Sequence, residues 1–130
     1  MNTQKQETDV LDLQLVATIV YIGSLIISIF LTYNDKMDVL NLDKIFTEKQ
    51  NRNLSIFNRF LVVILTLVFL YASYETRRLA KIKGEKLENF NLQVMASEIS
   101  LVSTLIVLYV VIKSQGEQYS IISGISNPNL

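Results

Sequence analysis

Three long stretches of the chain are apolar, and polar segments separate them. Residues 13–33 read LQLVATIVYIGSLIISIFLTY and contain no charged side chain. Residues 60–74 read FLVVILTLVFLYASY, and residues 94–112 read VMASEISLVSTLIVLYVVI, with the single acid Glu98 near the start. A helix needs about 20 mainly apolar residues to cross the roughly 30 Å hydrocarbon layer of a bilayer. The pattern therefore predicts three membrane-spanning helices.

The second apolar stretch reaches the length of a span only when its flanking residues join it. Extending it back to residue 55 places Arg59 inside the span, where a long side chain can carry its charge toward the headgroups. We therefore predict an all-α integral membrane protein, a small bundle of three transmembrane helices in a single domain. The predicted spans cover residues 11–34, 55–83 with a cytoplasmic extension, and 91–113.

Composition favours a membrane protein over a soluble helical bundle. Half of the residues are hydrophobic, 18% are charged, and the mean hydropathy is +0.34. Soluble domains average about 25% charged residues, and a soluble helix presents a broad charged face that residues 13–33 lack. We expect the first span to remain attached, because its leader is net acidic and its apolar run exceeds the ~7–15 residues of a signal peptide core. The abundance of Ile, Asn and Lys favours a bacterial source.

The first polar segments carry few structural signals. Residues 1–9 are predicted to be a frayed tail, and Asp9 or Asp12 is the expected cap of the first helix. In the first loop, apolar residues recur at helical spacing, which is compatible with a short helix on the membrane surface. An irregular polar loop is the alternative. The apolar residues concerned are Val39, Leu42, Ile45 and Phe46.

The later polar segments contain clearer signals for where helices begin and end. Gly84 is predicted to end the second helix in a left-handed conformation, and Asn89 or Asn91 to cap the third. Residues 114–130 contain two glycines and the only proline, and they are predicted to form a loose tail.

Polar side chains within the apolar stretches fall on one side of each helix. In the first stretch they recur every three or four positions, which confines them to an arc of about 120°. Lipid tails are as apolar as Leu, so small residues and interhelical hydrogen bonds hold membrane helices together. A hydrated path is the alternative use of such a stripe. The predicted helix-packing seam comprises Gln14, Thr18, Tyr21, Ser24, Ser28, Thr66, Ser73, Ser97, Ser100 and Thr104.

Glu98 is an acid placed inside a predicted span, and two interpretations compete. An intramembrane carboxylate is a candidate for proton or cation binding, and it could also accept a hydrogen bond from the hydroxyl of Tyr71, Tyr74 or Thr18. Alternatively, the hydrocarbon span begins after Glu98, which leaves the carboxylate among the headgroups near Arg77 or Lys81.

A basic cluster follows the second span in the segment RRLAKIKGEK. Clustered cations next to a span attract anionic lipid, dock a soluble acidic partner, or simply set the topology. Basic residues divide evenly between the two sides, but this cluster is the denser group, so we predict a cytoplasmic N-terminus and second loop. The lipid or topology cluster is Arg77, Arg78, Lys81 and Lys83.

The remaining composition narrows the chemistry. The chain has no Cys and no His, which removes thiolate chemistry, the usual zinc sites and imidazole-based triads. No phosphate-binding Gly-rich loop is present, and zero net charge argues against nucleic-acid binding. We expect no metal and no cofactor. The expected function is a non-catalytic membrane protein, a subunit, scaffold or regulator that contacts lipid and a second copy or another membrane protein. The alternative is a homo-oligomeric channel, transporter or lytic pore.

Overall fold

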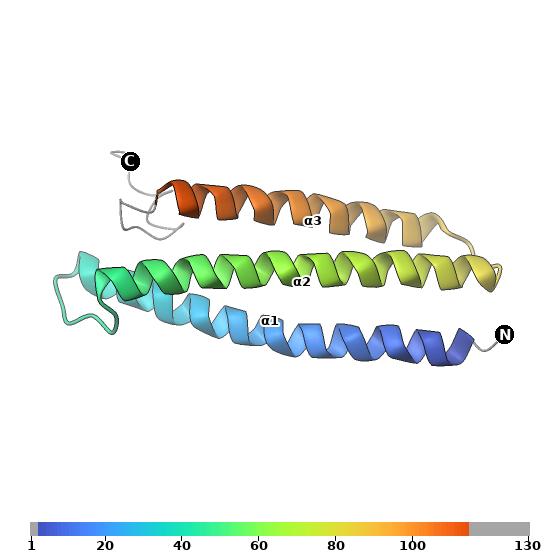
Figure 1. The fold of residues 1–130 in the computed structure, drawn as a ribbon, viewed down its shortest axis with the longest axis horizontal. Helices are drawn as coiled ribbons and strands as arrows, with labels where there is room; N and C mark the ends of the chain where they lie inside the picture. The colour runs from blue at the N-terminus through green and yellow to red at the C-terminus, as the bar shows by residue number, and fades with distance from the viewer. Residues whose placement is uncertain (1–2, 115–130) are drawn as a thin grey trace.

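The computed structural model describes residues 3–114, which form three antiparallel helices (Figure 1). Helix α1 runs from Thr3 to Val39, α2 from Glu48 to Ile82, and α3 from Glu88 to Lys113. Helix α2 lies between the other two and packs against both, whereas α1 and α3 scarcely touch each other (Figure 1). The start of α1 and the second loop share one end of the bundle, and the first loop shares the other end with the end of α3.

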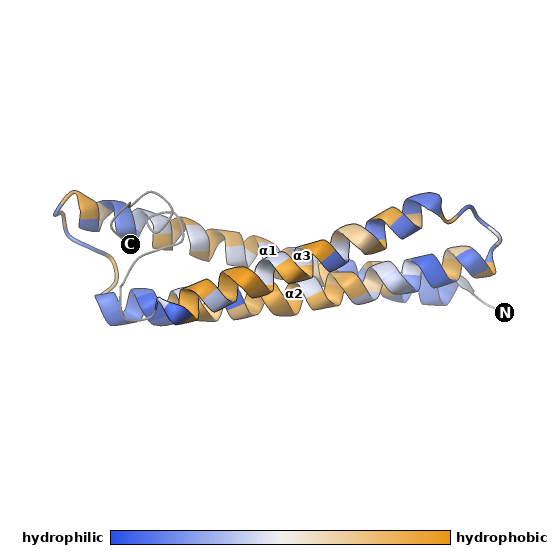
Figure 2. Cartoon of the chain, turned by 90° about the horizontal axis from the view of Figure 1, so that it is seen from above, coloured by the Kyte–Doolittle hydropathy of each residue, from blue (hydrophilic) through white to orange (hydrophobic). Residues whose placement is uncertain are grey.

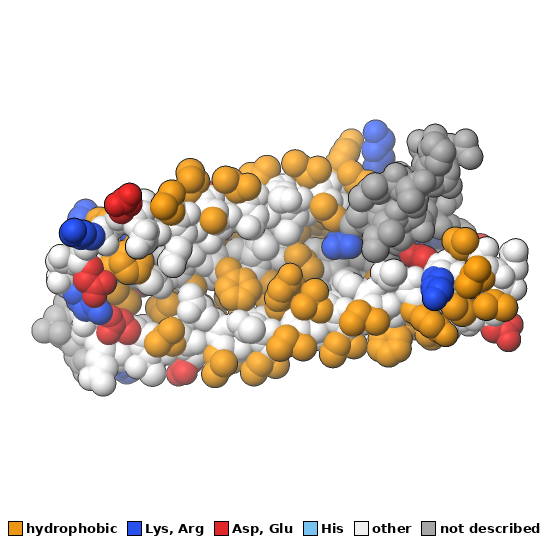
Figure 3. Space-filling view, turned by 180° about the vertical axis from the view of Figure 1, so that it is seen from behind, with side chains coloured by type: hydrophobic (Ala, Val, Ile, Leu, Met, Phe, Trp, Pro, Cys, Tyr) orange, Lys and Arg blue, Asp and Glu red, His pale blue; other side chains and the backbone are white. Residues whose placement is uncertain are grey.

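All three helices are long and apolar enough to cross a membrane. Their middle sections are apolar and their ends polar (Figure 2). Large apolar side chains cover much of the outer surface, and charged ones concentrate toward the ends (Figure 3). Soluble proteins rarely expose such continuous apolar surface. The predicted fold class, a small bundle of three candidate transmembrane helices, is confirmed.

Helices α1 and α2 extend beyond the predicted spans. They contain 37 and 35 residues, which at about 1.5 Å per residue makes each more than 50 Å long. The hydrocarbon layer accounts for only about 30 Å of that length. Both helices therefore carry polar turns that project past the membrane.

The prediction of a frayed start was wrong for the described residues, because α1 is helical from Thr3 onward. Asp9 and Asp12 consequently lie inside the helix and do not cap it. The cause is tertiary. Val10 is buried against Ala72 and Leu79 of α2, so the projecting part of α2 gives the first turns of α1 a surface on which to pack.

The first loop adopts the irregular alternative and contains no separate helix. Val39 is the last residue of α1, and the chain then turns through Asn41, whose φ is +58°. The amide of Phe46 donates to the side chain of Asn34 at 2.8 Å, which fixes the loop against α1. Helix α2 then starts with a capping box formed by Thr47 and Gln50.

The second loop confirms one expected signal and corrects another. Gly84 has a φ of +76°, the left-handed conformation predicted for the residue after α2. Asn89 and Asn91 do not cap α3, since the helix begins at Glu88 and its cap position, Leu87, makes no side-chain hydrogen bond. The chain reverses so tightly after Gly84 that α3 starts before either asparagine. Apart from Ser114, the predicted loose tail lies outside the described residues.

Ala72 tests the packing between α1 and α2. Its exposed fraction is 0%, so Ala72→Leu should overpack the contact and lower the free energy of unfolding by about 1–3 kcal/mol. Gly23→Leu is the matched control, because no neighbouring atom lies within 4 Å of the position of its added Cβ. Circular dichroism during unfolding in mixed micelles measures both. Equal stability of the two variants would contradict this packing.

Candidate functional site

A buried side-chain amide joins the middle of α1 to α2. Asn58 and Ser24 are each only 1% exposed. The Ser24 hydroxyl donates to Asn58 Oδ1 at 2.7 Å, and Asn58 Nδ2 donates to the Ser28 hydroxyl at 2.9 Å. One amide therefore bridges two hydroxyls that lie one turn apart on α1.

The spacing of the serines explains this contact. Ser24 and Ser28 are four residues apart and so lie on one face of the helix, and their small side chains let the backbone of α2 approach closely. In hydrocarbon, a polar group without a partner costs several kcal/mol on scales that exclude hydrogen bonding. A shift of α1 by one residue would separate Asn58 from both hydroxyls, so the bridge selects one register.

A second amide layer lies at the end of the bundle that carries the first loop. Asn34 of α1 and Asn51 of α2 are buried. Asn34 Nδ2 donates to Asn51 Oδ1 at 3.2 Å, and Asn51 Nδ2 lies 3.4 Å from Asp35 Oδ1. Because Asn34 also accepts from Phe46, this layer ties two helices and their connection together.

Hydroxyl pairs join α2 to α3. The Ser73 hydroxyl donates to the carbonyl of Phe69, and Ser97 approaches Ser73 Oγ at 2.9 Å, so Ser97 is the donor across the interface. Two turns away, Thr66 and Thr104 lie 3.2 Å apart, and each also lies within reach of a carbonyl of its own helix. The α2–α3 contact thus uses shared hydroxyls where α1–α2 uses amides.

The residues of the predicted helix-packing seam play different roles in the structure. Six of its residues take part in hydrogen bonds between helices, namely Ser24, Ser28, Thr66, Ser73, Ser97 and Thr104. Thr18 instead donates to the carbonyl of Gln14 on its own helix at 2.7 Å, and it is exposed. Tyr21 and Ser100 do not reach another helix but line a groove.

That groove runs between α1 and α3 across one face of α2 and has a volume of about 520 Å³. It exists because α2 separates its two neighbours. Apolar residues of α2 form part of its wall, and Tyr21 borders it from α1. Helix α3 supplies the apolar Ile99 and five small or hydroxyl residues, namely Ala96, Ser97, Ser100, Ser103 and Thr104.

Glu98 lies on the outside of the α2–α3 pair. Its carboxylate accepts a hydrogen bond of 3.0 Å from the Tyr74 hydroxyl, and both residues are exposed. Within residues 3–114, Glu98 forms no ion pair, and no group of three or more potential metal-binding side chains occurs. The carboxylate is thus held by one tyrosine near an end of the membrane-spanning region.

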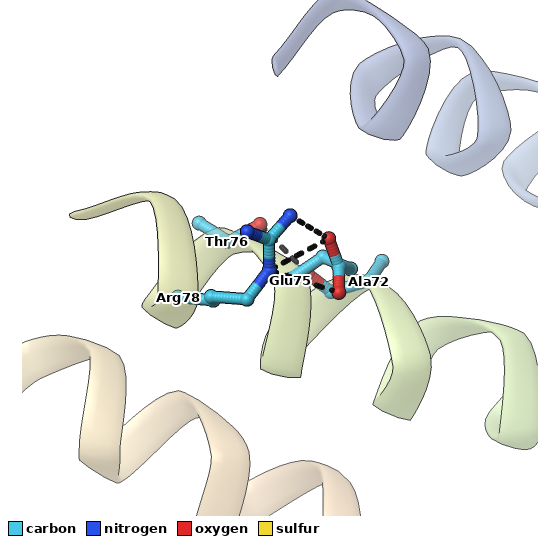
Figure 4. A network of polar contacts seen from close by, with 4 residues as sticks. All are labelled: Ala72, Glu75, Thr76 and Arg78. Carbon is cyan, nitrogen blue, oxygen red and sulfur yellow. Dashed lines mark hydrogen bonds and ion pairs between the residues drawn. The ribbon is translucent and has the colours of Figure 1, made fainter. Parts of the chain in front are cut away.

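The basic cluster splits into paired and unpaired residues. Arg78 donates from both Nε and Nη2 to the carboxylate of Glu75, and the shortest distance, from Nη2 to Oε2, is 2.7 Å (Figure 4). In the same turn, Thr76 donates to the carbonyl of Ala72 (Figure 4).

Lys83 is the second paired cation of this cluster. It forms ion pairs with Glu7 of α1 and, at 3.2 Å, with Glu85. Hydrogen bonds to Glu7 and Glu85 raise the pKa of Lys83 above its ordinary value. Arg77 and Lys81 have no ion-pair partner within the described part of the chain.

The predicted helix-packing seam contains none of the three buried asparagines, Asn58, Asn34 and Asn51. The last two lie where apolar stretches give way to polar loops, so no periodicity distinguishes them from solvated residues. In comparisons with known proteins, no family model, curated protein or solved structure matches the chain. The arrangement itself offers hydrogen bonding between helices and a groove open to the membrane.

A double-mutant cycle tests the Asn58 bridge. We expect Ser24→Ala and Asn58→Ala to be coupled by about 0.6 kcal/mol, and by at most about 1.7 kcal/mol, as for hydrogen bonds between other membrane helices. The coupling is obtained from the free energies of unfolding of the wild type, both single variants and the double variant, measured in mixed micelles. Thr18→Val is the control, because its hydroxyl bonds only its own helix, and it should change stability by less than about 0.5 kcal/mol. Coupling indistinguishable from zero would remove the bridge as a source of stability.

Proposed function

We propose that this chain is a non-catalytic integral membrane protein that acts by lateral association with another transmembrane helix. In that role it serves as an accessory subunit, scaffold or regulator of a membrane complex. The observation that supports the proposal best is the groove between α1 and α3, which lies at membrane depth and is lined by hydroxyls.

The lining of the groove favours a helix over lipid. Ala96 and Ser100 form a pair of small residues four positions apart, the spacing that allows close helix approach. Ser100 and Ser103 face the groove, and neither hydroxyl has a hydrogen-bond partner among residues 3–114. Acyl chains offer such groups no partner, whereas an incoming helix with small or polar residues does. The groove opens sideways, so a helix of a second copy or of another membrane protein reaches it through the bilayer.

Leucine substitutions in the groove test this role. Ser100→Leu with Ser103→Leu fills the groove and removes its hydroxyls, and we expect it to weaken association about 5- to 30-fold, the effect of losing one packed polar contact of about 1–2 kcal/mol. Val102→Leu with Ile106→Leu is the matched control, because both residues are exposed and lie outside the groove. Extraction in mild detergent followed by native mass spectrometry identifies whether copies or companions remain bound.

Three outcomes decide between the alternatives. Loss of bound chains in the groove variant alone supports association. A wild-type chain that is monomeric and without companions contradicts it. Rapid dye leakage from liposomes that contain only this protein would favour a homo-oligomeric pore instead, with the hydroxyl face lining the path.

We place the N-terminus and the second loop in the cytoplasm, supported by the dense basic cluster beside α2. The antiparallel order puts the first loop on the opposite side. In this Cys-free chain, Asn89→Cys should therefore be labelled from the cytoplasm and Leu42→Cys from outside by a membrane-impermeant maleimide. Both positions are exposed, and neither substitution changes the charge. The reverse labelling pattern would invert the assignment.

A further inference from the structure

The four basic residues of the cluster are not equivalent in the structure. Arg78 is neutralised by Glu75, and Lys83 by Glu7 and Glu85. Arg77 and Lys81 are exposed and have no ion-pair partner within residues 3–114. Two cations of the cluster are therefore engaged in ion pairs within the protein, and two remain available to an external anion.

The two available cations, Arg77 and Lys81, lie on the same face of α2. Arg77 and Lys81 are four residues apart on α2, which places their side chains one above the other on the same helix face. Tyr74 lies three residues before Arg77, so it belongs to the same face, one turn nearer the apolar section. Its hydroxyl is oriented by the hydrogen bond to Glu98.

The depth of this face matches the headgroup layer. The apolar run of α2 ends at Tyr74, and Arg77 follows one helical turn later, about 4.5 Å farther along the axis. Tyr71 and Tyr74 are both exposed, and exposed tyrosines at the end of a span mark the boundary between hydrocarbon and headgroups. Lys81 lies one further turn toward water.

We propose that Arg77 and Lys81 bind the phosphate of an anionic phospholipid, with its acyl chains lying along the exposed side of Tyr71 and Tyr74. The planar guanidinium can donate two hydrogen bonds to one phosphate, while the ammonium supplies a point charge. The Glu98 carboxylate lies on the hydrocarbon side of the pair and is held by Tyr74, so the headgroup binds on the water side of it. This site depends on the membrane fold alone and not on occupation of the groove.

Native mass spectrometry of the full chain in detergent micelles tests the site by titration with phosphatidylglycerol and, separately, phosphatidylcholine. The wild type should bind a first phosphatidylglycerol more tightly than phosphatidylcholine. Arg77→Gln with Lys81→Gln should weaken that binding about 25-fold, since each cation near an anionic headgroup contributes about fivefold. Arg78→Gln with Lys83→Gln removes the same charge from the same helix and should weaken it less than about threefold.

The control variant also removes the ion pair between Lys83 and Glu7 of α1, so helix content by circular dichroism is measured for each protein. Exchanging the cations, Arg77→Lys with Lys81→Arg, keeps both charges and should retain the preference for phosphatidylglycerol. Equal losses in the two glutamine variants would show that the cluster acts through its total charge and would overturn the site. No loss in either variant would overturn it as well.

A free phosphate ion offers the same chemistry, and competition separates the two sources. Inorganic phosphate added at constant ionic strength should leave the bound phosphatidylglycerol in place, because the lipid is also held through its acyl chains. Complete displacement by inorganic phosphate would reassign the residues to a soluble anion and overturn the lipid proposal. Purification in detergent before titration keeps any role of these residues in membrane insertion out of the result.

Discussion

The bundle depends on hydrogen bonds between side chains inside a solvent that offers none. An apolar helix surface is solvated equally well by lipid and by another helix, so apolar contact alone contributes little to helix association. On one side of α2, the buried Asn58 forms hydrogen bonds with two serines of α1. On the other side, Ser73 and Thr66 form hydrogen bonds with α3. Each such bond is modest in energy, but every alternative register leaves polar groups in hydrocarbon.

Much of this fold follows from the sequence because lipid imposes a simple rule. A run of about 20 apolar residues has to become a helix that satisfies its own backbone. The positions of Ser24 and Ser28 on one face are equally visible, since periodicity alone determines them. The left-handed Gly84 follows from the absence of a Cβ atom, which lets glycine adopt this conformation at little steric cost. These features are local, and a single sequence reveals them.

Features that depend on contact between distant residues were not predictable in the same way. The helical start of α1 requires the projecting part of α2, against which Val10 packs. The sequence of residues 1–9 does not indicate that α2 offers a surface on which they can pack. Likewise, Thr18 and Ser24 look alike in the sequence, and only the position of α2 decides that one bonds its own helix and the other bonds Asn58. The ion pair between Lys83 and Glu7 has the same origin, because Glu7 is remote from Lys83 in the chain.

The central position of α2 also has a mechanical consequence. Since α1 and α3 contact α2 through different sets of side chains and scarcely touch each other, each interface can be disturbed without the other. A substitution at one interface can therefore leave the contacts of the other outer helix with α2 in place. A disturbance of either outer helix therefore reaches the other mainly through the shared middle helix.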